Sequence, residues 1–146
     1  MRKIIFIASL LLSTHTICTA QEFKVITSVE SIVPSGMGRS RIIDTKEEKD
    51  YEAYTSTQTE ENNTRNKAKR GDIRVKNFEE TKLLNFYNIA GIRFQNIAAN
   101  DAVISSKLNK MSKEGWELIH VISAVESDAG DKDGQGIFIT RYFFKK

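Results

Sequence analysis

A helix pattern and a strand pattern meet at Gly115, and this junction constrains the fold more than any other feature. Upstream, apolar residues spaced i, i+4, i+7 predict an amphipathic helix over 100–114, with Asn-Asp as its N-cap. Gly115 stands where a left-handed residue ends a helix. Downstream, alternating apolar residues predict a strand over 116–125 and a hairpin partner over 137–144. The predicted class is therefore α+β.

The remaining strands are predicted from shorter patterns. Alternation over 23–33 predicts an N-terminal strand, and Arg-Ile-Ile at 41–43 can start a second one. Because both faces of 116–125 are partly apolar, we expect it to be a central strand covered on both sides. Residues 78–97 fit either a helix or a pair of strands, and the pattern does not separate the two. We expect a small antiparallel sheet, the N-terminal strand plus the C-terminal hairpin, packed on a helix.

The first twenty residues have the form of a secretory leader. Arg2 and Lys3 precede an apolar run over 4–12, which is shorter than the roughly 20 residues that span a bilayer. Small residues at the end of the leader predict cleavage before Gln21, without a lipid on Cys18, because the residues before this cysteine do not form a lipobox. We therefore expect an exported protein, periplasmic or extracellular, without a transmembrane segment in the mature chain.

Cleavage would leave residues 21–146 as a single domain with no cysteine and one histidine, His120. This composition excludes disulfides, thiol nucleophiles and Cys/His zinc sites. Because the leader carries two bases, the formal net charge falls from +3 to +1 on cleavage, which gives no argument for nucleic acid. We expect no catalytic residues, no metal and no cofactor.

Residues 44–76 form a long polar insertion with an acidic half, 44–61, and a basic half, 65–76. Few of these residues can be buried, so we expect a mobile or surface-laid excursion. A solvated loop or mutual pairing of the two halves is favoured over a nucleic-acid site, because no aromatic residues are interleaved with the bases.

The best candidate ligand site is the glycine-containing run around Arg39. Gly36 and Gly38 free backbone amides, and Arg39 and Arg41 add fixed positive charge, so the run could hold an anion. A glycine turn with two surface arginines is the favoured alternative. Their acidic partner is then internal, with the acidic half at 44–61 the nearest in sequence.

The acidic, glycine-rich loop at 126–136 is a candidate calcium-binding loop. In an EF-hand register, Ala129 and Thr140 would occupy the first and twelfth positions, which need carboxylates. A solvated turn is therefore favoured.

Trp116 and His120 can be read as a ligand pocket or as a structural junction with Gly115. The structural interpretation, a core tryptophan and a hydrogen-bonded strand histidine, is favoured because no nucleophile or acid pair accompanies them. If the ring is fully buried, Trp116→Ala should cost about 3–5 kcal/mol.

The run K-E-G-W-E-L at 113–118 resembles a small bacterial family known as domain of unknown function 4177. Its members have a strand, a helix ending in E-G-W-E-L and a closing hairpin that ends in aromatics and lysine, as at 142–146. The resemblance covers 99–146 well and 23–33 loosely. The long insertion instead resembles longer secreted relatives with a G-x-G-R-S-R-like segment. The family has no assigned activity, so the resemblance implies the fold and leaves function open.

The function that the sequence favours is a secreted, non-catalytic module that binds an envelope protein or glycan, or supports an envelope assembly. One alternative is an enzyme that uses carboxylates or arginines on envelope glycans, which a deep cleft with two acids would favour. Another is a structural homo-oligomer assembled through the sheet, which a flat apolar sheet face would favour.

Overall fold

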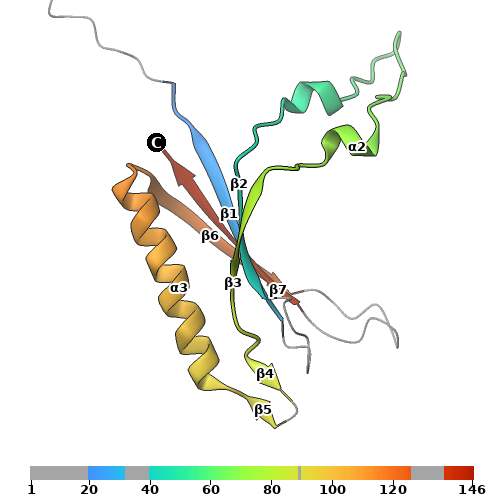
Figure 1. Ribbon diagram of the computed structural model, residues 1–146. Coiled ribbons are helices and arrows are strands. Elements are labelled where there is room, and N and C mark those ends of the chain that lie inside the picture. Colours follow the sequence, from blue (N-terminus) through green and yellow to red (C-terminus); the bar gives the residue numbers. More distant parts are fainter. Residues whose placement is uncertain (1–19, 32–39, 89, 126–136) are drawn as a thin grey trace, which may run out of the picture.

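A five-stranded antiparallel sheet with one long helix on a single face forms the body of the protein (Figure 1), which confirms the predicted α+β class. This computed structural model describes residues 20–31, 40–88, 90–125 and 137–146. The strand order in the sheet is β3-β2-β1-β7-β6. The sheet strands are β1 (Phe23–Ser31), β2 (Arg41–Thr45), β3 (Phe78–Lys82), β6 (Glu117–Val125) and β7 (Ile137–Lys145), and the helix is α3 (Phe94–Lys113).

Gly115 ends α3 as the sequence predicts. Its φ of +89° lies in the left-handed region, where a side chain would be strained. The Gly115 N–H donates to the Ser112 carbonyl and the Trp116 N–H to the Met111 carbonyl, each at 3.0 Å. These two bonds satisfy carbonyls that the end of the helix leaves without partners, and they turn the chain directly into β6.

The start of α3 differs from the prediction, because the helix begins at Phe94 rather than at Asn100. Asn100 lies inside the helix and is buried. Its side-chain amide is hydrogen-bonded to the backbone just after β3. It accepts from the Leu84 N–H at 2.8 Å and donates to the Leu84 carbonyl at 2.8 Å and to Glu30 at 2.9 Å. Asn100, which the sequence predicts as the N-cap, therefore lies within α3 and joins the helix to the chain after β3.

Residues 78–93 form strands and their connections, and residues 94–97 begin α3, so the strand alternative holds up to the start of the helix. β3 is followed by a short hairpin of β4 (Tyr87–Asn88) and β5 (Gly91–Ile92), and α3 starts directly after it. Gly91 has a φ of +106° in this hairpin and does not end a helix.

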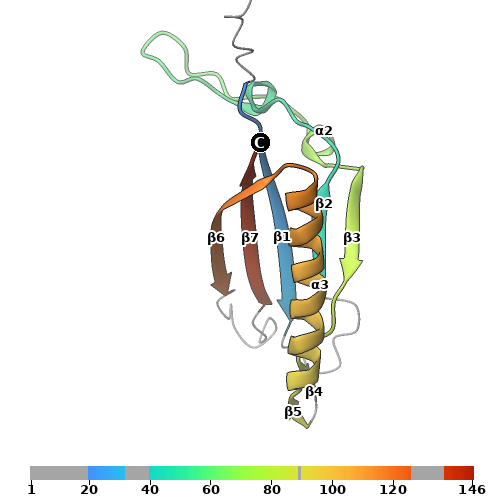
Figure 2. The same ribbon diagram turned by 90° about the vertical axis from the view of Figure 1, so that its left-hand side faces the viewer.

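The core lies between α3 and the β1–β2 side of the sheet (Figure 2). Because side chains alternate across a strand, the buried residues of β1, β2 and β7 define the helix-facing side of the sheet. Among the described residues, five apolar side chains are buried, namely Ile26, Ile42, Leu83, Met111 and Phe144.

The prediction that 116–125 is a covered central strand is wrong. β6 lies at the edge of the sheet, and all nine of its residues are exposed. An irregularity between Leu118 and His120 shifts its alternation, so Leu118 and Val121 face the helix side while His120 and Ile122 face the opposite side. A sequence pattern that is apolar on both faces of a strand does not distinguish a central strand from an uncovered edge strand.

The insertion leaves the sheet between β2 and β3 as an excursion, residues 46–77, at the same end as the C-terminus (Figure 1). It contains two single-turn helices, η1 (Tyr51–Tyr54) and α2 (Arg70–Ile73). Its two halves are joined through the backbone, because Lys49 and Tyr54 both donate to the Asp72 carbonyl, at 3.1 and 2.9 Å. Among the described residues no ion pair joins an acid of 44–61 to a base of 65–76, so the expected pairing of the two charge blocks is not seen.

Candidate functional site

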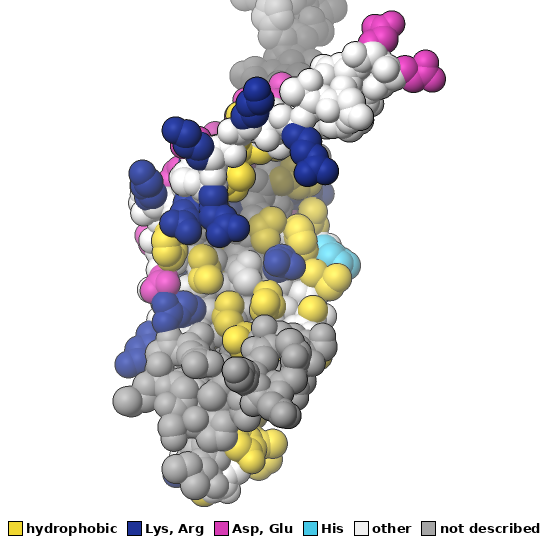
Figure 3. Space-filling model, turned by 90° about the vertical axis from the view of Figure 1, so that its right-hand side faces the viewer, with side chains coloured by type: hydrophobic (Ala, Val, Ile, Leu, Met, Phe, Trp, Pro, Cys, Tyr) yellow, Lys and Arg dark blue, Asp and Glu magenta, His cyan; other side chains and the backbone are white. Residues whose placement is uncertain are grey.

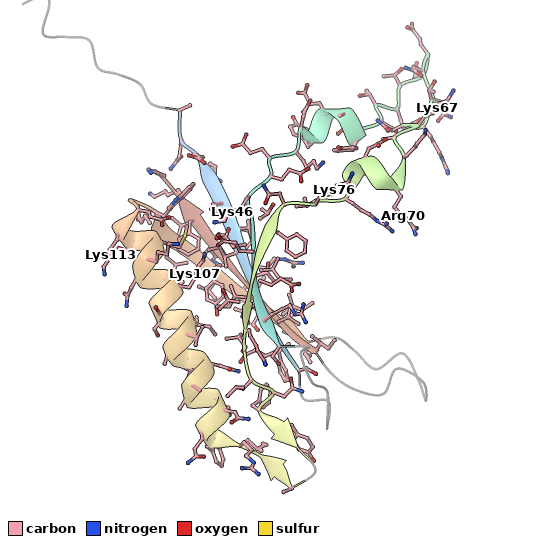
Figure 4. All side chains as sticks on the ribbon, viewed as in Figure 1. Lys46, Lys67, Arg70, Lys76, Lys107 and Lys113 are labelled. Atoms are coloured by element: carbon pink, nitrogen blue, oxygen red, sulfur yellow. The ribbon has the colours of Figure 1, made fainter. Side chains whose placement is uncertain are left out.

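Three lysines from three elements converge on the buried carboxylate of Asp44, in β2. Lys24 lies 2.9 Å from Asp44 Oδ1, and Lys46 and Lys107 lie 3.0 and 2.6 Å from Oδ2. Figure 4 labels Lys46 and Lys107 on the side of the sheet that carries α3. Asp44 is 1% exposed, although its sequence neighbours predict a solvated acidic segment. We call these four residues the lysine cluster.

The lysine cluster keeps Asp44 ionised. Burial alone would raise the pKa of this carboxyl, but hydrogen bonds from Lys107, Lys24 and Lys46 outweigh it and lower the pKa from 3.8 to about 2. Each lysine therefore has a counter-ion at neutral pH, and the cluster joins β1, β2 and α3. The geometry is that of a structural ion network.

Trp116 lies beside this cluster and is half-buried between two cations. Lys24 Nζ lies 6.0 Å and Lys146 Nζ 5.7 Å from the centre of its ring. The ring packs against the core and also lines an open groove of ≈ 720 Å³ at the start of β1. The predicted fully buried tryptophan is therefore only partly buried.

Because the ring is half-buried, Trp116→Ala should lower the free energy of unfolding by about 1–3 kcal/mol, less than for a fully buried ring. Urea denaturation of the mature chain measures this, with Trp116→Phe as the milder control. An unchanged free energy of unfolding together with a lost binding activity would contradict the structural role.

Three acids, Glu22, Glu47 and Glu48, line the same groove. A hydrogen bond from Lys49 and backbone N–H groups of Lys76 and Asn77 lower the pKa of Glu47 to about 2. An acid this strong stays ionised at neutral pH and is a poor proton donor. Glu47 is therefore a poor candidate for a general acid in this groove.

His120 differs from the predicted hydrogen-bonded strand histidine. It is exposed in β6, and its ring lies 6.0 Å from that of Phe143 at a tilt of 47°. It lies at the border of the sheet side opposite α3.

The predicted anion site is described only in part. Gly36, Gly38 and Arg39 lie outside the described residues, as does the acidic loop at 126–136. Arg41 lies in β2 and pairs with Glu80 of β3 at 2.6 Å. The acidic partner of Arg41 is thus internal, but it comes from β3 and not from the acidic half of the insertion.

Arg41→Ala should lower the free energy of unfolding by less than about 1 kcal/mol, because the pair is partly exposed. Sulfate should then change the melting temperature of the wild type and of the variant equally, as followed by thermal shift. A sulfate-dependent rise confined to the wild type would instead identify an external anion site.

The sheet side opposite α3 has no described element over it, and it is mainly apolar (Figure 3). The pairing register places alternate residues of four neighbouring strands on this side. We call it the open face, and its apolar side chains are Phe23, Val25, Val29, Ile43, Ile122, Ile139 and Phe143. Phe23, Val25 and Ile122 are exposed, and the other four are half-buried. Such a contiguous apolar surface is a candidate interaction site.

Arg141 lies within the open face, between Thr27 of β1 and Ile122 of β6. It is exposed, and its side chain has no ion pair or hydrogen bond in the described part of the chain. Figure 3 shows a basic side chain among the hydrophobic ones on this face.

The open face and Arg141 were not among the predicted site residues. The sequence signal for the open face is that β6 is apolar on both sides. This pattern also predicts a strand that is covered by the rest of the chain, which is the interpretation given above.

Within 20–31, 40–88, 90–125 and 137–146, no group of three His, Cys, Asp or Glu residues is placed to hold a metal ion. In the same ranges no helix has the length and apolarity needed to cross a bilayer. No family model, curated protein or solved structure matches the chain. The likeness to domain of unknown function 4177 stays a prediction.

Proposed function

We propose that the chain is an exported, non-catalytic assembly module of the cell envelope that binds a partner protein through its open face. The observation that carries this proposal is the apolar sheet face that no element of the described residues covers. A flat apolar face favours assembly over catalysis. The groove beside Trp116 is open, and Glu47, one of its three acids, is held ionised by Lys49.

The balance of buried and exposed apolar side chains supports the same proposal. The described residues bury five apolar side chains but expose fifteen large ones, several of them on the open face and β6. Contact with water is unfavourable for such a surface, and a partner that covers it gains roughly 25 cal/mol per Å² of apolar area.

Photo-crosslinking in the native host tests the proposal. A benzophenone amino acid in place of Ile122, on the open face, should give a covalent adduct with a protein. The same group in place of Ser105, exposed on α3, is the matched control and should give little or none. Equal adducts at both positions, or none at Ile122, would contradict the proposal.

Export is a separate expected result. Mass spectrometry of the protein from its host should give a mature chain that begins at Gln21 and carries no lipid. An uncut chain in the cytoplasm, or an acylated N-terminal Cys18, would overturn the export part of the proposal.

A further inference from the structure

We infer that the partner segment covering the open face is an acidic amphipathic protein helix that places a carboxylate on Arg141. This inference rests on the proposed function, since it names the chemistry of the partner for the same face.

The charge on the open face is positive and uncompensated. Its acids already have partners, because Glu80 pairs with Arg41 at 2.6 Å and Glu117 with Lys145 at 3.1 Å. Arg141 and the exposed Lys82 have no such partner among the described residues. A cation surrounded by apolar side chains is costly to cover unless the covering surface brings an acid.

The excursion carries eight bases and seven acids, and three of its bases lie beside this face. Figure 4 shows the excursion leaning to the side of the sheet opposite α3, with Lys67, Arg70 and Lys76 labelled on it. All three are exposed and have no ion pair in the described part of the chain. An acidic partner would therefore be attracted to the corner between the excursion and the sheet.

The architecture of the sheet favours a helix as the covering segment. The sheet already packs against a helix of 20 residues on its other face, so a second helical layer suits the open face. Apolar residues spaced i, i+3, i+4 would contact Val29, Ile139 and Phe143, and an acid between them would reach Arg141.

Charge and shape decide against two other occupants. A second copy with its open face on this one would bring Arg141 and Lys82 against the same bases. A planar anionic bilayer would meet the projecting excursion before the sheet.

Charge reversal at Arg141, combined with crosslinking from position 122, tests the inference. Arg141→Glu should lower the yield of the protein adduct about tenfold or more, whereas Arg141→Lys should keep it within about threefold. Sequencing of the crosslinked peptide should give an acidic amphipathic segment, and changing its acid to arginine should restore the yield with Arg141→Glu.

The outcomes separate the two proposals. A protein adduct that is insensitive to the charge of Arg141, or an adduct of twice the chain mass, overturns the acidic helix and leaves the assembly function standing. Adducts with lipid alone, or sedimentation of the mature chain with phosphatidylglycerol vesicles, overturn both. Arg141 is exposed, so the variant should fold; if its circular dichroism changes, Lys82→Glu on the same face replaces it, with the same loss expected.

Discussion

Replacing Asp44 with asparagine is expected to lower the free energy of unfolding by about 3 kcal/mol. Among the described residues, the change removes the only carboxylate that pairs with Lys24 and the closest one to Lys46 and Lys107, while the three ammonium groups stay near one another. The expected loss is at the low end for a buried pair, because lysine stems are long enough to swing their charge toward water. Urea denaturation at neutral pH measures the loss.

Glu79→Gln is the matched control, because Glu79 also meets Lys46 and Lys107, at 3.3 and 3.8 Å, but is 57% exposed. Its loss should stay below about 1 kcal/mol. Equal losses for the two variants would mean that burial of Asp44 adds nothing to the network.

The stabilisation from Asp44 should also depend on pH in a defined window. The pKa of its carboxyl is lower in the folded chain, about 2, than the ordinary 3.8, so the unfolded chain binds the proton more tightly. The contribution of about 2 kcal/mol is therefore complete above pH 4 and is lost as the pH falls toward 2. The difference between wild type and Asp44→Asn should shrink over this window. Glu47, whose pKa is also lowered, is present in both proteins and cancels.

Phe144→Ala is expected to lower the free energy of unfolding by about 3–5 kcal/mol. The ring is 1% exposed and belongs to the buried cluster with Ile26 and Met111. Since that cluster is small, the cavity removes a large share of the contacts between α3 and the sheet. A loss of this size approaches the whole stability of a small domain, so the measurement should be made at low temperature and low denaturant.

Phe23→Ala is the control for this prediction, because it removes the same ring from β1 at a position that is 65% exposed. The free energy of unfolding should change by less than about 1 kcal/mol. A large loss for Phe23→Ala in the isolated chain would mean that the open face is covered within the chain itself.

Local patterns predict this fold well, and long-range contacts account for what they miss. Gly115 ends α3 as predicted, because a helix stop depends on the conformation of one residue. The edge position of β6 was missed, because an apolar strand gives no sign of whether its cover lies in the same chain. The burial of Asp44 was missed as well, since it depends on Lys24 of β1 and Lys107 of α3, which are far from Asp44 in sequence.

The two edges of the sheet differ in a way that limits how the sheet can be extended. β3 carries Glu79, Glu80 and Lys82 among its five residues, whereas β6 carries one charged residue, Glu117, among nine. Charges discourage the addition of a strand from another molecule, so such a strand would add at β6. Two copies joined at β6 would then present β3 at both outer edges. Growth would stop at the pair, and this sheet would not propagate into a fibre.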